Sequence, residues 1–368
     1  MRILVIRNDK IGDLILSLST LGSLRKSYPE AHISILVKPY TQEILYLNPD
    51  IDEVIVDNGK DFFKLLREIK DKRFDAAIVL YPNWKNALLC FLSRIPVRVG
   101  TGYKSAGILF NKRVYVHRTK VMCHETDYCL KLVEGIGAKV ESKEIKIWIK
   151  DEDKEYGRRL LEKYQLLGSK PLIGVHPGCG GSALNWTISN YAQLIDEIST
   201  KYKTKVVLTG SIEEKDLIEE IISHTRTQPI NLTEQTSSLG QLMGVLSCYH
   251  LFIAPSTGPM HLAAALGIKV IALFPPIRAM SPLKWGPAGK DHRILLPHNV
   301  TCPHRKCKLS KCTFYNCMEK ITTQMVLEAI LDFGGNWEEI GVRPRCVKQS
   351  LYCPSGENLD RGKGSHHS

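Results

Sequence analysis

The chain has 368 residues, of which 43% are hydrophobic and 24% are charged. These values are typical of folded globular proteins and argue against disordered, collagen-like or disulfide-scaffold chains. The length fits two domains of ordinary size, which favours a ligand site between them. No run of residues is apolar over the roughly 20 positions that a membrane span needs, and the first residues carry charges without a signal-peptide cleavage site. We therefore expect a cytoplasmic protein.

The positive charge of the chain is concentrated in one stretch. The chain has 50 Lys and Arg against 38 Asp and Glu, a net charge of +12. Residues 76–124 contain no acidic side chain, and their basic residues are Lys85, Arg94, Arg98, Lys104, Lys112, Arg113, Arg118 and Lys120. Such a stretch attracts phosphates and carboxylates, although a solvated surface position explains any single member equally well. Because interleaved aromatic residues and known reading motifs are lacking, we favour an anionic substrate or leaflet surface over a nucleic acid.

Short apolar runs alternate with helical patterns in the first half of the chain. We predict strands at 2–6, 33–37, 54–56 and 76–80, a helix after the polar turn at 7–13, and another helix at 62–70. The basic stretch interrupts this pattern before a helix near 126–136, and a charged helix at 150–163 leads onward. The alternation predicts a parallel sheet covered by helices.

The same alternation restarts in the second half. Predicted strands at 172–176, 206–209, 251–254 and 270–274 alternate with helices near 191–202, 213–224, 239–247 and 260–266. We predict an α/β protein with two Rossmann-like domains facing across a cleft, an N-terminal domain at 1–155, a C-terminal domain at 156–330 and an irregular tail at 331–368. Ligands of such sheets bind beyond the carboxyl ends of the strands, so the loops there are the candidate sites.

The loop after the first strand contains one glycine, Gly12. The three-glycine dinucleotide fingerprint is therefore absent, which argues against a nicotinamide-dependent dehydrogenase. Gly12 permits the close approach of another backbone or a ligand, and Asp13 opens the next helix. The helix dipole alone favours an Asp in a first turn, so the residue type by itself assigns Asp13 no function.

Three loops of the second half carry the residue types of a nucleotide-sugar site. A glycine-rich loop whose backbone N–H groups can cradle phosphate holds His176, Pro177, Gly178 and Gly180. The next strand ends at Thr209, Gly210 and Ser211, and the helix after it opens with Glu213 and Glu214, whose carboxylates suit ribose hydroxyls but are also ordinary at a helix start. Trp186 contacts either the sugar or the protein interior.

The strongest local pattern is a strand, a tight turn and a small-residue helix at 251–267. Ser256 or Thr257 suits the cap of this helix, Pro259 its first turn, and Gly258 its close approach. Its free N–H groups and positive dipole end suit a diphosphate. His261 lies one turn in and either donates to a ligand oxygen or is a satisfied structural residue.

In their order along the chain, these segments resemble glycosyltransferase family 9, the heptosyltransferases, from residue 1 to about 330. The resemblance rests on residues 7–13, 176–178, 209–211, 256–261 and 274–276, together with Trp186. It implies a GT-B fold and metal-independent, inverting transfer of heptose from ADP-heptose onto a lipopolysaccharide core acceptor, with no cofactor. Contact with the cytoplasmic face of the inner membrane stays open.

The resemblance also implies roles for individual residues. The residue matching Asp13 is the general base, and the groups around Thr257, Gly258 and His261 stabilise the leaving diphosphate. We assign the acceptor, an anionic glycolipid, to the first domain and expect it to contact Lys10, Gly12, Lys85, Arg94, Arg98, Lys104, Arg113, Arg118 and Lys120. The donor residues are His176, Pro177, Gly178, Gly180, Trp186, Thr209, Gly210, Ser211, Glu213, Glu214, Ser256, Thr257, Gly258, Pro259 and His261.

Two departures from the family pattern leave the sugar open. Ser256 stands where these enzymes often carry Asp, and the segment before Trp186 lacks the usual Lys or Arg. A transferase that uses a different nucleotide sugar, a sugar-nucleotide or polyanion binding protein with little activity, and an epimerase therefore remain alternatives.

Cysteines occur at every fifth position at Cys302, Cys307, Cys312 and Cys317. This spacing suggests zinc, but the close cysteine pairs of structural zinc sites are missing. We expect no metal and leave zinc as the alternative.

Overall fold

The computed structural model describes residues 1–168, 171–181, 183–300, 302, 307, 312 and 317–333. Of the tail predicted at 331–368, residues 334–368 lie outside this part, as does Ser182 of the glycine-rich loop. The described residues form two six-stranded sheets in which all the strand pairs are parallel. The predicted α/β class is therefore confirmed.

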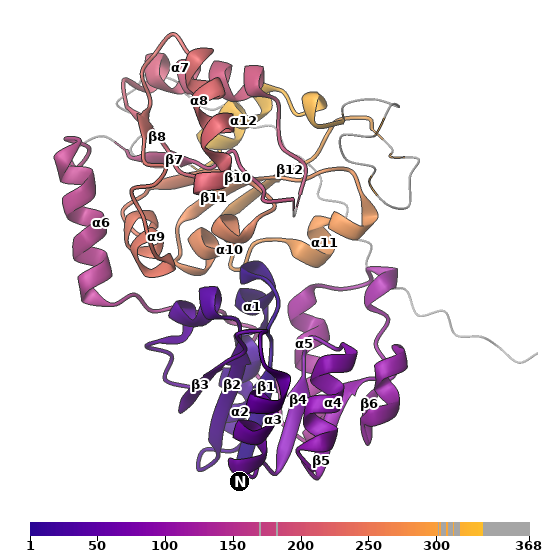
Figure 1. The fold of residues 1–368 in the computed structure, drawn as a ribbon. Coiled ribbons are helices and arrows are strands. Elements are labelled where there is room, and N and C mark those ends of the chain that lie inside the picture. Colours follow the sequence, from indigo (N-terminus) through magenta and orange to yellow (C-terminus); the bar gives the residue numbers. More distant parts are fainter. Residues whose placement is uncertain are drawn as a thin grey trace, which may run out of the picture. The chain divides into compact units, whose positions relative to one another are not determined.

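The first sheet has the strand order β3-β2-β1-β4-β5-β6 (Figure 1). Its strands are β1 (Arg2–Ile6), β2 (His32–Val37), β3 (Glu53–Val56), β4 (Ala76–Val79), β5 (Val97–Thr101) and β6 (Lys112–Val114). Its helices are α1 (Ile11–Ser17), α2 (Ser19–Ser27), α3 (Phe62–Asp71), α4 (Trp84–Leu92) and α5 (Glu125–Val133). The chain adds β2 and β3 on one side of β1 and then β4, β5 and β6 on the other, so the switch point lies between β1 and β4, as in dinucleotide-binding sheets.

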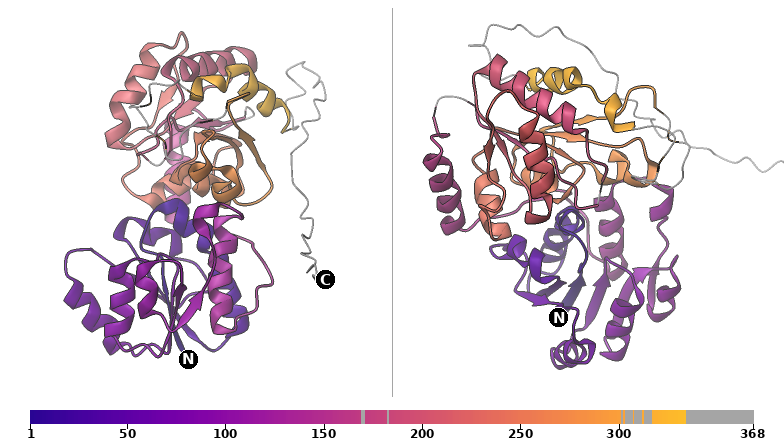
Figure 2. Two further views of the ribbon diagram at one scale, coloured as in Figure 1. Left: turned by 90° about the vertical axis from the view of Figure 1, so that its right-hand side faces the viewer. Right: turned by 45° about the horizontal axis from the view of Figure 1, so that its top comes forward.

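The second sheet repeats that order, β12-β11-β10-β7-β8-β9. Its strands are β7 (Ile173–Val175), β8 (Val206–Leu208), β9 (Ile230–Asn231), β10 (Leu251–Pro255), β11 (Lys269–Leu273) and β12 (His292–Leu295). Its helices are α7 (Ile188–Tyr202), α8 (Lys215–Ser223), α9 (Leu239–Leu246), α10 (Gly258–Ala265), α11 (Pro282–Trp285) and α12 (Thr323–Leu331). Figure 2 shows α12, in yellow, beside α7, which it contacts.

Short 3-10 helices connect several of these elements. They are η1 (Pro39–Leu45), η2 (Ser105–Leu109), η3 (Arg118–Lys120), η4 (Glu134–Ile136), η5 (Ile212–Glu214), η6 (Arg278–Met280) and η8 (Cys317–Lys320). No helix of the described residues has the length and apolar character that crossing a membrane requires.

Alternation along β1 explains how one strand serves two buried layers. Ile3 and Val5 pack into the layer that α1, α2 and α5 cover, whereas Leu4 and Ile6 pack into the layer of α3 and α4. All four side chains are fully buried. A strand covered on both faces reads as a continuous apolar run, which is why β1 was predictable to the residue.

The predicted interruption by the basic stretch is wrong. Residues 84–114 continue the alternation with α4, β5, η2 and β6. β5 and β6 lie toward one edge of the sheet, and Lys112 and Arg113 within β6 are exposed. Their charge hid the short strands from a search for apolar runs.

The predicted linking helix is α6 (Asp151–Lys163). It packs tightly on α9 through glycines, because a Cβ added to Gly157 would lie 2.3 Å from the carbonyl carbon of Gly244. The backbones meet at a distance that larger residues forbid. The domain limits at 155 and 330 stay a prediction.

Candidate active site

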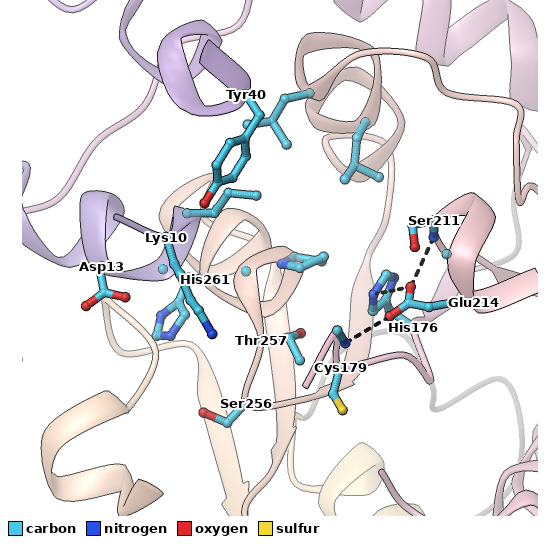
Figure 3. A pocket seen from close by; sticks show the side chains of 18 of the residues that line it. Lys10, Asp13, Tyr40, His176, Cys179, Ser211, Glu214, Ser256, Thr257 and His261 are labelled. Atoms are coloured by element: carbon cyan, nitrogen blue, oxygen red, sulfur yellow. Dashed lines mark hydrogen bonds and ion pairs between the residues drawn. The ribbon is translucent and has the colours of Figure 1, made fainter. Parts of the chain in front are cut away.

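A cavity of about 950 Å³ lies at the switch points of both sheets. The loops after β1 and β4 line it from the first sheet, and those after β7 and β10 line it from the second. In open α/β proteins ligands bind at these points, and the volume suits a drug-sized or nucleotide-sized molecule. Figure 3 shows Lys10, Asp13 and His261 on one side of this cavity and His176, Glu214 and Ser211 on the other.

Many residues singled out from the sequence line this cavity. They are Lys10, Gly12, Asp13, His176, Gly180, Gly210, Ser211, Glu214, Ser256, Thr257, Gly258, Pro259 and His261. The other predicted residues do not line it, namely Pro177, Gly178, Trp186, Thr209, Glu213, Lys85, Arg94, Arg98, Lys104, Arg113, Arg118 and Lys120. The cavity therefore gathers the proposed base and most of the proposed donor loops, but not the basic stretch.

Arg7, at the end of β1, organises the acidic groups beside the cavity. Its fully buried guanidinium donates to Asp13 Oδ1 at 2.8 Å and to Glu125 Oε1 at 3.2 Å. Its Nε also lies 3.1 Å from Asp9 Oδ1. Burial opposes the charge of Arg7, but Asp9 and the other nearby acidic groups outweigh that cost and raise its pKa.

Asp13 is held with one oxygen engaged. Arg7 occupies Oδ1, and Oδ2 has no hydrogen-bond partner among the described residues. The side chain is 21% exposed, and burial raises its pKa against the attraction of Arg7, with Glu125 adding to the rise. A carboxylate with a raised pKa and an available oxygen has the properties of a general base.

A lysine of the second sheet's loops reaches the same cluster. Lys284, in α11, lies 3.8 Å from Glu125 Oε2, while Arg118 lies 3.1 Å from Oε1. Burial lowers the pKa of Lys284, and Glu125 partly opposes this. Nearby, His124 Nε2 hydrogen-bonds with the carbonyl of Gly286 at 3.1 Å. Glu125 therefore ties α11 to the network that holds Asp13.

Helices α1 and α10 meet beside Asp13. A Cβ on Gly12 would lie 2.6 Å from His261 Cδ2, and one on Gly258 would lie 3.1 Å from Ile11 Cβ. Glycine at position 12 is thus required by the neighbouring imidazole rather than by backbone dihedrals. The contact brings Asp13 to the start of α10, whose first N–H groups lack helical partners.

His261 is 96% buried in this contact, and its Nδ1 has no partner among the described residues. Burial, reinforced by His124, lowers its pKa to about 3, so the ring is neutral at physiological pH. The predicted side-chain cap of α10 is wrong. Thr257 occupies the cap position without capping, because its hydroxyl donates to the carbonyl of Pro255.

Glu214 clamps the glycine-rich loop rather than presenting a free carboxylate. It accepts from the backbone N–H groups of Gly180 at 3.2 Å and Ser211 at 3.0 Å, and it lies 3.6 Å from His176 Nε2. A Cβ on Gly178 would lie 2.0 Å from its carboxyl group, so only glycine fits there. Glu213 is exposed.

Trp186 packs in the protein interior. It is 2% exposed, its Nε1 donates to the carbonyl of Ile321 at 2.8 Å, and its ring meets Tyr191 edge-on at 5.0 Å. Of the two positions left open by the sequence, these contacts favour interior packing.

Three of the residues that line the cavity were not predicted from the sequence. Tyr40 lies between β2 and β3, and its hydroxyl donates to the carbonyl of Asp9. Ser238, the N-cap of α9, lines the far side, where a run of polar residues before an apolar helix was the only available clue. Tyr81 lies two residues after the end of β4. The rule that ligands bind where the strand order switches identifies this position only once the order of the strands is known.

The regularly spaced cysteines Cys302, Cys307 and Cys312 lie close enough to Cys317 to act on its thiol. Burial raises the pKa of Cys317, and Cys307, Cys302 and Cys312 raise it further. The part of the chain that the structure describes contains no group of three or more His, Cys, Asp or Glu side chains that could hold a metal ion. The absence of a metal ion stays a prediction.

The fold and the cavity together define a protein of the GT-B fold, because two parallel sheets have the same strand order and a nucleotide-sized cavity lies at the switch points of both. Residues 62–314 match the family model described as glycosyltransferase family 9 (heptosyltransferase). The chain belongs to this family, as its residues indicated, and is a glycosyltransferase.

Individual relatives cover most of the chain. It is 33% identical over 312 residues to a putative glycosyltransferase of Haemophilus influenzae, covering 82% of this chain and 89% of that one. It is 28% identical over 349 residues to lipopolysaccharide heptosyltransferase 2 of Escherichia coli, covering 90% and 97%. The solved structure of the E. coli ADP-heptose LPS heptosyltransferase II superposes with a TM-score of 0.73 at 24% identity, covering 90% and 98%.

Proposed function

We propose that this protein transfers heptose from ADP-heptose to a lipopolysaccharide core acceptor, with inversion at the anomeric carbon and without a metal ion. The observation that carries the proposal is that Asp13 and the start of α10 line one cavity. The relative named lipopolysaccharide heptosyltransferase 2, at 28% identity, supports the sugar and the acceptor. The name of the E. coli structure supports ADP as the carrier.

In the proposed reaction, Asp13 Oδ2 takes the proton of an acceptor hydroxyl. The hydroxyl oxygen attacks the anomeric carbon, and the bond from that carbon to the diphosphate breaks, so that ADP leaves with the electron pair. The raised pKa of Asp13 makes it a stronger base than an ordinary carboxylate. A single displacement from the face opposite ADP inverts the configuration.

The negative charge that develops on ADP falls beside the first turn of α10. Unpaired N–H groups and the positive end of the helix dipole stabilise an anion there. Lys10 lines the same side of the cavity and adds a positive charge (Figure 3). His261 is neutral and supplies one N–H group. These groups do the work that a divalent cation does in other glycosyltransferases, so we expect transfer to continue in excess EDTA.

The sharpest test compares two acidic residues of the same loop. Asp13→Asn should lower the transfer rate by roughly 10²–10⁴-fold while donor affinity stays within about twofold, because the amide keeps the shape but cannot take a proton. Asp9→Asn is the matched control, since Asp9 also lies beside Arg7 and lines the cavity. It should retain transfer within about tenfold. Equal losses in the two variants, or transfer retained in Asp13→Asn, would refute the assignment of the base.

The donor is tested separately with a thermal-shift panel of ADP, UDP, GDP and CMP sugars. ADP-heptose should raise the unfolding temperature most. Stabilisation by another nucleotide sugar, followed by its transfer, would keep the enzyme class but replace the proposed donor. Consumption of donor without any acceptor would favour an epimerase, and binding without turnover would favour a binding protein.

A further inference from the structure

Helix α4 has apolar side chains on its outer face. Trp84, Leu88, Phe91 and Leu92 are 50%, 36%, 47% and 43% exposed. Their spacing of i, i+4, i+7 and i+8 places them along one side of the helix. We call these four residues the α4 stripe.

The opposite side of α4 is also apolar and forms the protein core. Ala87, Leu89 and Cys90 are fully buried against the first sheet. Lys85 is the only charged residue of the helix. A helix with apolar side chains on two opposite sides normally has a partner on both, and among the described residues α4 has a core on one side only. Figure 1 shows α4 at the outside of the first sheet.

Positive charges lie at both ends of α4, beside Phe91 and next to the turn η2. Arg94 is exposed just after the helix, the Arg98 guanidinium lies 5.5 Å from the centre of the Phe91 ring, and Lys104 donates to the carbonyl of Pro82 just before the helix. Arg113 donates to the carbonyls of Phe110 and Ile108. We call Arg94, Arg98, Lys104 and Arg113 the cation rim.

The charge of the cation rim is not neutralised within the protein. Its hydrogen bonds go to carbonyl oxygens, and none of the four forms an ion pair with a carboxylate in the described part of the chain. Lys85 and Arg118 differ, because they pair with Asp57 and Glu125. Residues 76–124 contain no acidic side chain, so the charges that this segment presents attract an anionic surface.

Further exposed apolar and aromatic side chains lie close to the stripe. The turn η2, which packs on α4, carries Ile108 at 69% exposure. Tyr103 and Tyr115 are exposed and meet edge-on at 5.4 Å. Tyrosine and tryptophan are enriched where protein enters the headgroup layer of a bilayer, because their rings are both apolar and polar.

We propose that the α4 stripe and the cation rim form a docking surface for an anionic lipid leaflet. The apolar side chains would enter the layer between headgroups and acyl chains, while the cations contact lipid phosphates. The surface begins beside the cavity, because Tyr81 lines the cavity and Trp84 follows three residues later. A glycolipid whose acyl chains stay in the bilayer would thus present its sugars to Asp13. The inference goes beyond the proposed function, since lipid binding needs neither donor nor transfer.

The test is co-sedimentation of the full chain with vesicles of phosphatidylglycerol and phosphatidylcholine, compared with pure phosphatidylcholine. We expect binding to the anionic vesicles that falls steeply with salt. The triple variant Trp84→Ser/Leu88→Ser/Leu92→Ser should bind these vesicles about tenfold more weakly or worse, because three apolar anchors are lost. Arg94→Gln/Lys104→Gln should weaken binding by about fivefold for each cation removed.

Matched controls separate docking from general stickiness. Ile212→Ser removes an apolar side chain of 58% exposure from the second domain, and Lys201→Gln/Lys205→Gln removes the same charge there. Both should bind vesicles like the unchanged protein. Trp84 is the only exposed tryptophan among the described residues, so its fluorescence should shift to shorter wavelength on anionic vesicles and the shift should vanish in Trp84→Phe.

Several outcomes would overturn the proposal. The first is that the protein does not bind anionic vesicles, and the second is that the triple serine variant binds them as well as the unchanged protein. The third is that the protein does not bind vesicles but forms a concentration-dependent dimer, which the triple variant abolishes. The last would make the stripe an interface between copies. The proposed transfer reaction is assayed separately, with a deacylated, water-soluble acceptor that needs no membrane. On this acceptor the triple variant should be as active as the unchanged enzyme.

Discussion

Asp9 carries a stability cost that pH should reveal. Its Oδ1 is buried without a hydrogen bond, because Arg7 Nε, although 3.1 Å away, donates to the carbonyl of Asp13. Burial therefore raises the pKa of Asp9 from 3.8 to about 7, more than the attraction of Arg7 lowers it. At about 1.4 kcal/mol per pKa unit, keeping Asp9 ionised in the folded protein costs about 4 kcal/mol above pH 7.

The sign of the effect follows from proton binding. Since the folded-state pKa is raised, the native protein binds more protons than the unfolded chain between about pH 4 and pH 7. The contribution of Asp9 to stability is full below about pH 4 and is lost as the pH rises through about 7. Asp9→Asn mimics the protonated form and should be more stable than the unchanged protein at pH 8, by up to about 4 kcal/mol, with the advantage shrinking toward pH 4.

Guanidinium unfolding at pH 5, 6, 7 and 8 measures this difference through the shift of the first transition. Asp151→Asn is the control, because that carboxylate is exposed and pairs with Lys154 at the surface. The reasoning would be refuted if Asp9→Asn were less stable than the unchanged protein at pH 8, or if the difference in unfolding free energy between the two did not change with pH.

Two further predictions rest on close packing. Gly12→Ala places a methyl group about 2.6 Å from His261 Cδ2 and should lower the thermal unfolding midpoint and the transfer rate. Combined with His261→Ala, it should be no less stable than His261→Ala alone, and additive losses would contradict the proposed clash. Trp186→Phe leaves the carbonyl of Ile321 without its indole donor and should cost about 1–3 kcal/mol of stability while donor affinity, measured by calorimetry, stays the same. A loss of donor affinity would instead favour a sugar contact.

Local sequence patterns predicted the fold of the buried half of each sheet. β1 and β10 are continuous apolar runs because both faces are covered, and β1 was predicted with its observed limits. The edge strand β6 was not predicted, because its residues Lys112 and Arg113 are charged, as is typical of a loop. The charge of that stretch was identified correctly, but its place on the surface beside α4 was not.

The candidate site was predictable in part because its loops follow central strands. Residues 7–13 and 256–261 carry the small, polar and capping residues that such loops require, and most of them line the cavity. The resemblance to glycosyltransferase family 9 was inferred from the order of these loops along the chain. Tyr40 and Lys284 were missed, since nothing in the neighbouring residues of either one indicates a ligand or a charge partner.

The sequence by itself determined the alternation of strands and helices, the position of the polar loops and the concentration of positive charge, since each depends on residues close together in the chain. Only the tertiary structure decided which charges meet. Arg7 and Asp13 lie in one segment, but Glu125 and Lys284 come from two distant segments, and the pKa shifts of Asp13 and Lys284 depend on burial and on distances of a few ångströms. Burial and distance are properties of the folded arrangement, so no local pattern encodes them.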